Sequence, residues 1–223
     1  YSIATYTQNA TITAKALTLS TPTVTTTKVY DTYTTAAITS GGTLQTAIAA
    51  GTGTSSDGKP YTGDTVNVTL AANYNSASVT ATTISFTNSV SLGNSNYTLT
   101  LPSSVSGTIT AKAITLTGLS VPSSKVYDGT TTAVVSGTAT VAATEAPGVG
   151  SSTDGKAYTS DTVTVSGTAT GTYNNLNVAN ATTVTFGGLS LSNSNYSIAT
   201  YTQNATITAK AITLTGLSVP SSK

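Results

Sequence analysis

The chain has 223 residues, of which 7% are charged, and its formal net charge at pH 7 is +1. It contains no Cys, His, Met, Trp or Arg, whereas 53 residues are Thr. These absences exclude disulfides, thiolate zinc sites and cysteine nucleophiles, and they leave no ordinary general base near neutral pH. With no Arg and so little net positive charge, we also expect no binding of nucleic acid.

Internal repeats set the domain organisation. The opening sequence YSIATYTQNATITAKA (1–16) recurs letter for letter at 196–211, and KVYD (28–31) recurs at 125–128. The offset from Lys28 to Lys125 is 97 residues, so one module has about 97 residues. We expect four segments: 1–15, the C-terminal strands of a preceding module; 16–112 and 113–210, two whole modules; and 211–223, the first strand of a following module.

Within a module, apolar residues alternate with Thr and Ser at a period of two. Residues 64–70 (DTVNVTL) and 161–170 (DTVTVSGTAT) place Val on one face, and residues 82–86 (TTISF) and 182–186 (TTVTF) place Ile, Val and Phe likewise. Such alternation is typical of half-buried strands. The Ala-rich residues 43–50 have the composition for at most one helical turn.

Turn signals separate these strands. The dipeptide DG occurs at 57–58, 128–129 and 154–155, and GG occurs at 41–42 and 187–188. The sequence therefore predicts an all-β fold, with tandem immunoglobulin-size antiparallel β-sandwich modules of six or seven short strands each. Thr32 stands where the second module has Gly129, so this turn of the first module cannot use an Asp-Gly pair.

The junction between modules is predicted at KA[IL]. Ile207 and Ile212 have opposite parity in the strand-like sequence 205–217, and Ile109 and Ile114 repeat this change. A strand that is buried on one face keeps its parity, so we expect the chain to leave one core and enter the next after Ala113. No run of Gly, Ser or Pro interrupts this sequence, which predicts modules arranged as a stiff rod.

Seven acidic residues are the only candidates for acid–base chemistry or for binding a hard cation. Asp57 and Asp64 flank one loop, and Asp154 and Asp161 flank its copy, a pairing that a Ca²⁺ site would combine with backbone carbonyls. Calcium usually takes more carboxylates than this, so we expect a turn Asp and a strand-opening Asp instead. Repeated modules are a poor host for one catalytic cleft. We therefore expect no catalytic residue, cofactor or metal site, and no enzymatic activity.

Tyr residues also recur at matched positions. The pairs are Tyr30 and Tyr127, Tyr61 and Tyr158, and Tyr97 and Tyr196. A face of Tyr rings would stack on sugars, but recurrence favours core or corner positions whose hydroxyls bond to the backbone.

Lys15, Lys112 and Lys210 recur at the junction. A buried Lys beside an acid is one requirement for an isopeptide crosslink to Asn or Asp. Glu145 is the single Glu and has no copy in the other module, which disfavours this crosslink.

Four motifs together resemble a known type of repeat: KVYDGTTTA (125–133), DTVTV (161–165), NSNY (193–196) and ITAKAITLTGL (207–217). They are similar to the YDG-type tandem repeats of large bacterial surface and secreted proteins, which include filamentous haemagglutinin-like exoproteins and repeat adhesins. Module 16–112 departs from the pattern at Thr32.

The resemblance implies an extracellular location at the bacterial cell surface. It implies a structural repeat of a stalk, fibre or filament that serves surface display, adhesion or biofilm scaffolding. The alternative is a multivalent adhesin whose modules bind host or neighbour-cell glycans or proteins. The expected partners are neighbouring copies of the chain, with no nucleic acid and no membrane insertion.

Overall fold

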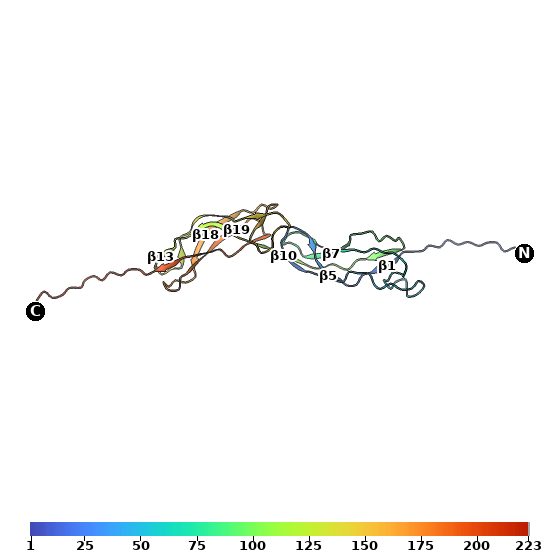
Figure 1. The fold of residues 1–223 in the computed structure, drawn as a ribbon, viewed down its shortest axis with the longest axis horizontal. Helices are drawn as coiled ribbons and strands as arrows, with labels where there is room; N and C mark the ends of the chain where they lie inside the picture. The colour runs from blue at the N-terminus through green and yellow to red at the C-terminus, as the bar shows by residue number, and fades with distance from the viewer. Residues whose placement is uncertain (223) are drawn as a thin grey trace. The chain divides into compact units, whose positions relative to one another are not determined.

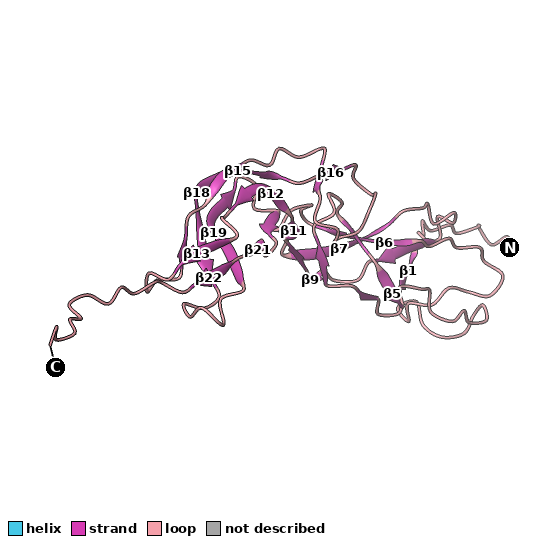
Figure 2. Cartoon of the chain, turned by 60° about the vertical axis from the view of Figure 1, so that its left-hand side comes forward, coloured by secondary structure: helices cyan, strands magenta, loops and turns pink. Residues whose placement is uncertain are grey.

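The computed structural model describes residues 1–222, which form strands and turns without a helix (Figure 2). The prediction of an all-β chain is confirmed, and residues 43–50 do not form the helical turn that was considered. Accordingly, residues 1–222 contain no helix with the length and hydrophobicity to cross a membrane. The chain divides into two compact units, Tyr1–Thr110 (unit 1) and Ala111–Lys223 (unit 2), which Figure 1 draws in successive colours.

Unit 1 is built on a four-stranded antiparallel sheet in the order β4-β6-β7-β9. Three two-stranded sheets, β1-β8, β10-β3 and β2-β5, complete it. Its strands are β1 (Lys15–Thr18), β2 (Thr23–Val24), β3 (Thr27–Val29), β4 (Thr35–Ala36), β5 (Ile38–Ser40), β6 (Leu70–Tyr74), β7 (Thr83–Asn88), β8 (Tyr97–Thr100), β9 (Val105–Ser106) and β10 (Thr108–Thr110).

Unit 2 has the corresponding four-stranded sheet in the order β14-β18-β19-β21. The pairs β11-β20, β12-β15, β13-β22 and β16-β17 accompany it. Its strands are β11 (Lys112–Ile114), β12 (Leu116–Ser120), β13 (Ser124–Val126), β14 (Thr132–Ala133), β15 (Ser136–Val141), β16 (Thr144–Glu145), β17 (Ala157–Tyr158), β18 (Val165–Tyr173), β19 (Thr183–Leu191), β20 (Tyr196–Ile198), β21 (Thr202–Asn204) and β22 (Thr206–Thr208).

The sheets are not purely antiparallel, which corrects the sequence prediction. In each unit the first strand pairs with a late strand in parallel: β1 with β8 in unit 1, and β11 with β20 in unit 2. The pairs β10-β3 and β13-β22 are also parallel. Parallel neighbours need a long crossover, and most of a unit lies between the members of each pair. Alternation within one strand carries no information on the direction of its partner.

Alternating burial places the core on one face of the long strands. In β7, Ile84 and Phe86 are buried and Thr83 and Ser85 are exposed; β19 repeats this with Val184 and Phe186. Each such side chain contributes about 1.5–3 kcal/mol when it is fully buried. The unit 2 core consists of Leu119, Val121, Ala133, Tyr173, Ala181, Val184, Phe186, Ala205 and Ile207.

Two predicted strands begin later than their Val alternation indicates. The strand expected at 64–70 starts at Leu70, and the one expected at 161–170 starts at Val165. Val66 and Val68 are half-buried as expected, but residues 64–69 belong to no strand. The Thr69 N–H donates to the Asn88 side chain at 3.0 Å, so a side-chain oxygen replaces a ladder carbonyl there.

The two copies of the repeated opening sequence have different structures. Residues 196–210 contain β20, β21 and β22, which pair with β11, β19 and β13. Residues 1–14 have the same letters but form no strand and are exposed. Residues 211–222 are likewise exposed and form no strand, and Lys223 lies outside the described residues. That residues 211–223 supply the first strand of a following module stays a prediction. A strand needs a partner for its backbone groups, and sequence alone does not supply one.

The predicted change of parity between Ile109 and Ile114 is present, but it occurs earlier than expected. Ile109 is buried, Ala111 is half-buried, and Lys112 and Ile114 are both fully buried with Ala113 exposed between them. The parity therefore changes at Ala111 and not after Ala113. A basic residue, Lys112, takes the first inward position of unit 2.

Candidate functional site: a buried lysine cluster in each unit

Lys112 lies in unit 2 with none of its surface exposed. Its Nζ donates a hydrogen bond to Glu145 Oε1 at 2.5 Å and forms an ion pair with Asp154 Oδ1 at 3.0 Å. Strand β11 supplies the Lys, β16 supplies the Glu, and the turn before β17 supplies the Asp. Buried charges are stable only when they are paired, and here one ammonium contacts two carboxyls.

Aromatic rings close the cluster. Lys112 Nζ lies 4.2 Å from the centroid of the Tyr158 ring, a cation–π distance. The Tyr196 hydroxyl donates to Asp161 Oδ2 at 2.7 Å and accepts the Tyr158 N–H at 2.9 Å. The two rings lie 6.5 Å apart. Together these contacts fix the ring that covers the ammonium.

Unit 1 repeats the cluster with one difference. Lys15 Nζ lies 2.9 Å from Asp57 Oδ1 and 4.2 Å from the centroid of the Tyr61 ring. Tyr97 takes the role of Tyr196: its hydroxyl donates to Asp64 at 2.6 Å and accepts the Tyr61 N–H at 2.9 Å.

The position of Glu145 is occupied by Ile48 in unit 1. The carbonyl of Glu145 accepts the Thr159 N–H at 2.7 Å, and the carbonyl of Ile48 accepts the Thr62 N–H at the same distance. The backbone is thus preserved while the second carboxyl is present in unit 2 alone.

Glycines hold the carboxyls close to the backbone. Gly150 has a φ of 78°, and a Cβ on it would lie 2.0 Å from Glu145 Oε2 and 2.4 Å from Asp154 Oδ2. Gly53 has a φ of 70°, and a Cβ there would lie 2.4 Å from Asp57 Oδ2 and 2.6 Å from Ile48 Cδ1. Any side chain at Gly150 would therefore displace both carboxyls of the unit 2 cluster.

The cluster shifts the pKa values of its members. Burial opposes ionisation of Lys112, but the hydrogen bond to Glu145 and the contact with Asp154 raise its pKa above the usual lysine value. Burial also opposes ionisation of Asp154, yet the Lys156 N–H and the Lys112 ammonium hold its pKa well below the usual range. In unit 1 the Lys15 ammonium and the Lys59 N–H lower the pKa of Asp57 to about 2.

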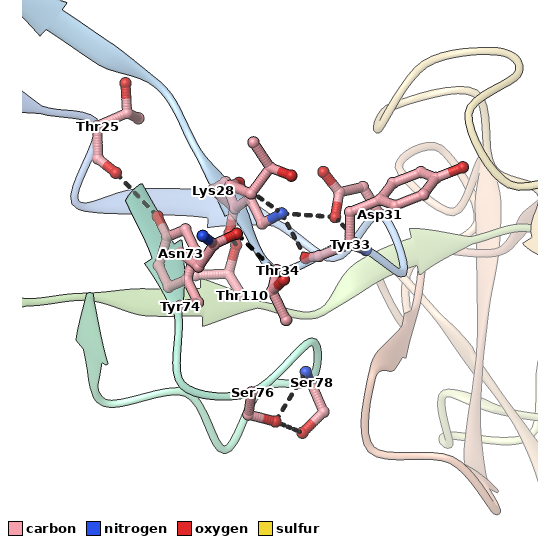
Figure 3. A network of polar contacts seen from close by, with 11 residues as sticks. Thr25, Lys28, Asp31, Tyr33, Thr34, Asn73, Tyr74, Ser76, Ser78 and Thr110 are labelled. Atoms are coloured by element: carbon pink, nitrogen blue, oxygen red, sulfur yellow. Dashed lines mark hydrogen bonds and ion pairs between the residues drawn. The ribbon is translucent and has the colours of Figure 1, made fainter. Parts of the chain in front are cut away.

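A second lysine cluster uses the KVYD motif (Figure 3). Lys28 Nζ donates to Asp31 Oδ1 at 2.7 Å and to the Tyr33 carbonyl at 2.6 Å, and it lies 5.3 Å from the Tyr74 ring centroid. Tyr74 in turn donates its hydroxyl to the Thr25 carbonyl at 2.9 Å. These hydrogen bonds of Lys28 are all to its own turn, so its ammonium does not point toward a ligand.

Unit 2 repeats this second cluster. Lys125 Nζ lies 2.8 Å from Asp128 Oδ1 and 5.4 Å from the Tyr173 ring centroid. The Thr130 carbonyl accepts a further bond from it at 2.8 Å.

The acids expected to flank the DGK loops do not share a ligand. Asp57 and Asp154 contact buried Lys residues, whereas Asp64 and Asp161 accept Tyr hydroxyls. Among residues 1–222, no three His, Cys, Asp or Glu residues form a group that could hold a metal ion.

The recurring Tyr residues are mostly buried, in agreement with the prediction that they occupy core positions. Tyr30, Tyr97, Tyr158 and Tyr196 are buried, but Tyr127 is 37% exposed. The Tyr97 and Tyr196 hydroxyls bond to a backbone N–H and also to an Asp, which the sequence did not indicate.

Sequence analysis considered the recurring lysines for a crosslink but disfavoured it, and it did not identify which of them are buried. Lys112 and Lys15 were noted as recurrent, but Lys210 is exposed, so recurrence alone does not identify burial. The usable signal was parity: Lys112 and Ile114 have the same parity, which places the Lys on the inward face. Glu145 was set aside because it has no copy, yet it contacts Lys112 directly.

Comparison with known proteins gives one family match. A YDG domain matches residues 110–205, which is less than half of the chain. No curated protein and no solved structure matches the chain.

The YDG match corrects several expectations from the sequence. YDG is also the name of the SRA-YDG type of domain, which is known from eukaryotic proteins that bind methylated DNA. On that description the match contradicts the assignment to haemagglutinin-like exoproteins and adhesins, the stalk, fibre or filament function and the extracellular location. It also contradicts the exclusion of nucleic acid as a partner. The physical reason is that alternation, repeats and low charge specify β-modules but carry no information on compartment.

Proposed function

We propose that the chain is a non-enzymatic pair of β-modules whose recurring polar residues hold loops onto strands. The observation that carries this proposal is the pairing of Lys15, Lys28, Lys112 and Lys125, each with an acid of its own unit. Polar groups that are fully used inside the fold are not available to a substrate.

Replacing a cluster lysine tests this use. Lys125→Met keeps the length of the side chain but leaves Asp128 without its cation, so we expect a lower unfolding temperature. Lys156→Met is the matched control, because Lys156 forms no ion pair with any of residues 1–222. Equal unfolding temperatures for the two variants would mean that Lys125 does not serve the fold.

We also propose that each unit is a small β-sandwich and that the two units form a stiff rod. The support for the sandwich is the core of unit 2, in which Leu119 and Val121 from β12 and its continuation pack with Val184 and Phe186 of β19. The support for stiffness is connectivity: β10 ends at Thr110 and β11 begins at Lys112.

Small-angle scattering tests the rod. A Gly-Ser insertion after Ala111 is the matched variant, because it leaves the buried Ile114 in place. We expect the unmodified chain to give a narrower distribution of maximum dimensions than the insertion variant. Equal distributions would contradict a stiff junction.

Nucleic-acid binding is a second candidate, favoured by the YDG match and by the name it shares with methyl-DNA-binding domains. Four of the eight lysines are paired with acids and the net charge is +1. Counterion release therefore contributes little to the affinity for nucleic acid. Binding would depend mainly on hydrogen bonds, and its affinity would change little with salt concentration.

Fluorescence anisotropy with methylated and unmethylated duplexes at several salt concentrations tests this candidate. Tighter binding of the methylated duplex, with a shallow dependence on salt, would support it. Absence of binding to either duplex at low salt would reject it.

A further inference from the structure

We propose that unit 2 crosslinks itself: Lys112 and Asp154 condense to an amide with loss of water, and Glu145 moves the protons. The crosslink would join the start of β11 to the turn that precedes β17. It is a modification site inside the fold and needs no ligand or cofactor.

The reacting groups are already in contact. Lys112 Nζ lies 3.0 Å from Asp154 Oδ1, which is bonded to the Cγ that the amine must attack, so the fold already holds the two reacting side chains together. Lys112 is fully buried, and the Tyr158 ring 4.2 Å from Nζ limits the directions in which it can move. The Lys112 and Glu145 side chains are buried and Asp154 is 18% exposed, and a site that is largely shielded from water favours condensation over the reverse hydrolysis.

Glu145 lies where a group that transfers protons to and from Lys112 is needed. Its Oε1 lies 2.5 Å from Lys112 Nζ, within reach of the proton that must leave before the amine can attack. Its Oε2 is buried and accepts no hydrogen bond among the described residues. The lone pairs of this oxygen are therefore available to hold a proton that leaves Lys112.

The two carboxyls also lie close to one another. Glu145 Oε2 and Asp154 Oδ2 both approach Gly150, where a Cβ would lie 2.0 Å and 2.4 Å from them. Glu145 Oε2 is therefore placed to pass the proton that it takes from Lys112 to Asp154 Oδ2, and the arrival of that proton makes Asp154 Cγ an electrophile.

The reaction balances without an oxidant or a second reactant. The Lys112 ammonium gives one proton to Glu145, and the neutral Nζ attacks Asp154 Cγ. Glu145 passes that proton, and then the second proton that leaves Nζ, to one Asp154 oxygen. The C–N bond forms, the C–O bond breaks and that oxygen leaves as water. Glu145 ends as it began, and the ammonium and carboxylate charges cancel in the neutral amide.

Unit 1 is an internal control. Lys15 and Asp57 have the same contact at 2.9 Å, and Tyr61 covers the ammonium at 4.2 Å. Ile48 occupies the position of Glu145 and has no group that can take a proton. We therefore expect condensation in unit 2 and none in unit 1.

Mass spectrometry of the whole chain tests the proposal. After incubation at neutral pH, we expect the intact chain to lack the mass of one water. A protease digest should yield a branched peptide that joins Lys112 to Asp154, while the peptides containing Lys15 and Asp57 remain separate. A folded chain of full mass, with the circular dichroism of β-structure, would overturn the proposal. So would a crosslink to a different acid.

Glu145→Gln tests the proton transfer. Gln has nearly the same volume and accepts no proton, so we expect this variant to keep its full mass. Glu145→Ile copies unit 1 and replaces the Gln variant if that one does not fold. Loss of water by a folded variant at the rate of the unmodified chain would overturn the role of Glu145.

Discussion

Thr32 and Gly129 occupy the same turn of the two units, and both have a left-handed backbone. The φ of Thr32 is 74° and that of Gly129 is 81°. The sequence indicated that Thr32 could not form an Asp-Gly turn, but the turn keeps this conformation without the glycine. Asp31 Oδ1 holds it by accepting the Tyr33 N–H at 2.9 Å and the Lys28 ammonium at 2.7 Å.

Thr32→Gly should therefore stabilise unit 1. A left-handed residue with a side chain costs about 1–2 kcal/mol, while glycine gives back about 0.4–1 kcal/mol through its freer unfolded chain. The expected gain is about 0.5–1 kcal/mol in the free energy of unfolding, measured by chemical denaturation. Gly129→Thr is the reciprocal variant and should destabilise unit 2; a gain in stability there would contradict the argument.

Acid should unfold the chain through its paired aspartates. The Lys125 ammonium and the Thr130 N–H lower the pKa of Asp128 to about 2, and Lys15 and the Lys59 N–H do the same for Asp57. Both values are depressed from an unfolded value near 3.8. The stability that these groups contribute is therefore present above pH about 4 and is lost as the pH falls toward 2.

A thermal melt at each pH measures this. The unfolding temperature should stay level from pH about 9 to 5, since no His titrates there, and should fall below pH about 4. In the variant Asp128→Asn, the unfolding temperature should fall less steeply below pH about 4, because one of the titrating carboxyls is gone. A midpoint that already declines between pH 7 and 5 would reveal a titrating group outside these pairs.

At the scale of elements, a residue in the two identical segments is buried only where its segment pairs with other strands. Ile207 in β22 is 2% exposed, and Ile12 occupies the same position of the repeated sequence but is fully exposed. Ile207→Ala should cost about 2–5 kcal/mol of unfolding free energy, because it opens a cavity in the unit 2 core. Ile12→Ala should stay within about 0.5 kcal/mol of the unmodified chain. Similar losses from both would mean that residues 1–14 also pack against a core.

The strands illustrate what the sequence can and cannot predict. Alternation located β7 and β19 because Ile84 and Phe86 are buried in unit 1 and Val184 and Phe186 face the core of unit 2. It did not predict the parallel pairing of β1 with β8, because each side chain records its face and not its neighbour. Nor did it predict the late start of β6, where the Asn88 side chain takes a backbone N–H.

The candidate site was predicted only in part, for a related reason. Sequence analysis identified Lys112, Glu145 and Asp154 as separate candidates. Their contact depends on β16 pairing with β17 and on the close approach of Gly150, which are tertiary features. The lack of a Glu in the first module was taken as evidence against a crosslink. In the structure it marks the difference between the unit 2 cluster, which has Glu145, and the unit 1 cluster, which has Ile48.

At the scale of the whole molecule, the repeats predicted the division into similar halves. The units divide after Thr110, and equivalent strands pair in the same register, as Thr27 with Thr108 and Ser124 with Thr206. Composition did not predict the biological setting, because Thr-rich strands and sparse charge suit β-modules in any compartment.

The duplication of residues 1–15 at 196–210 creates a competition during folding. The docking site for β20, β21 and β22 cannot distinguish two identical segments, so chain connectivity must decide between them. The native copy follows β19 after about five residues, whereas the other copy is about 100 residues from β11, a difference of about 2–3 kcal/mol in closure entropy. The order of synthesis acts in the opposite direction, because residues 1–15 leave the ribosome before residues 196–210 and can reach the nascent unit 2 before its own final strands exist. Connectivity therefore favours the late copy at this site, whereas the order of synthesis favours the early one.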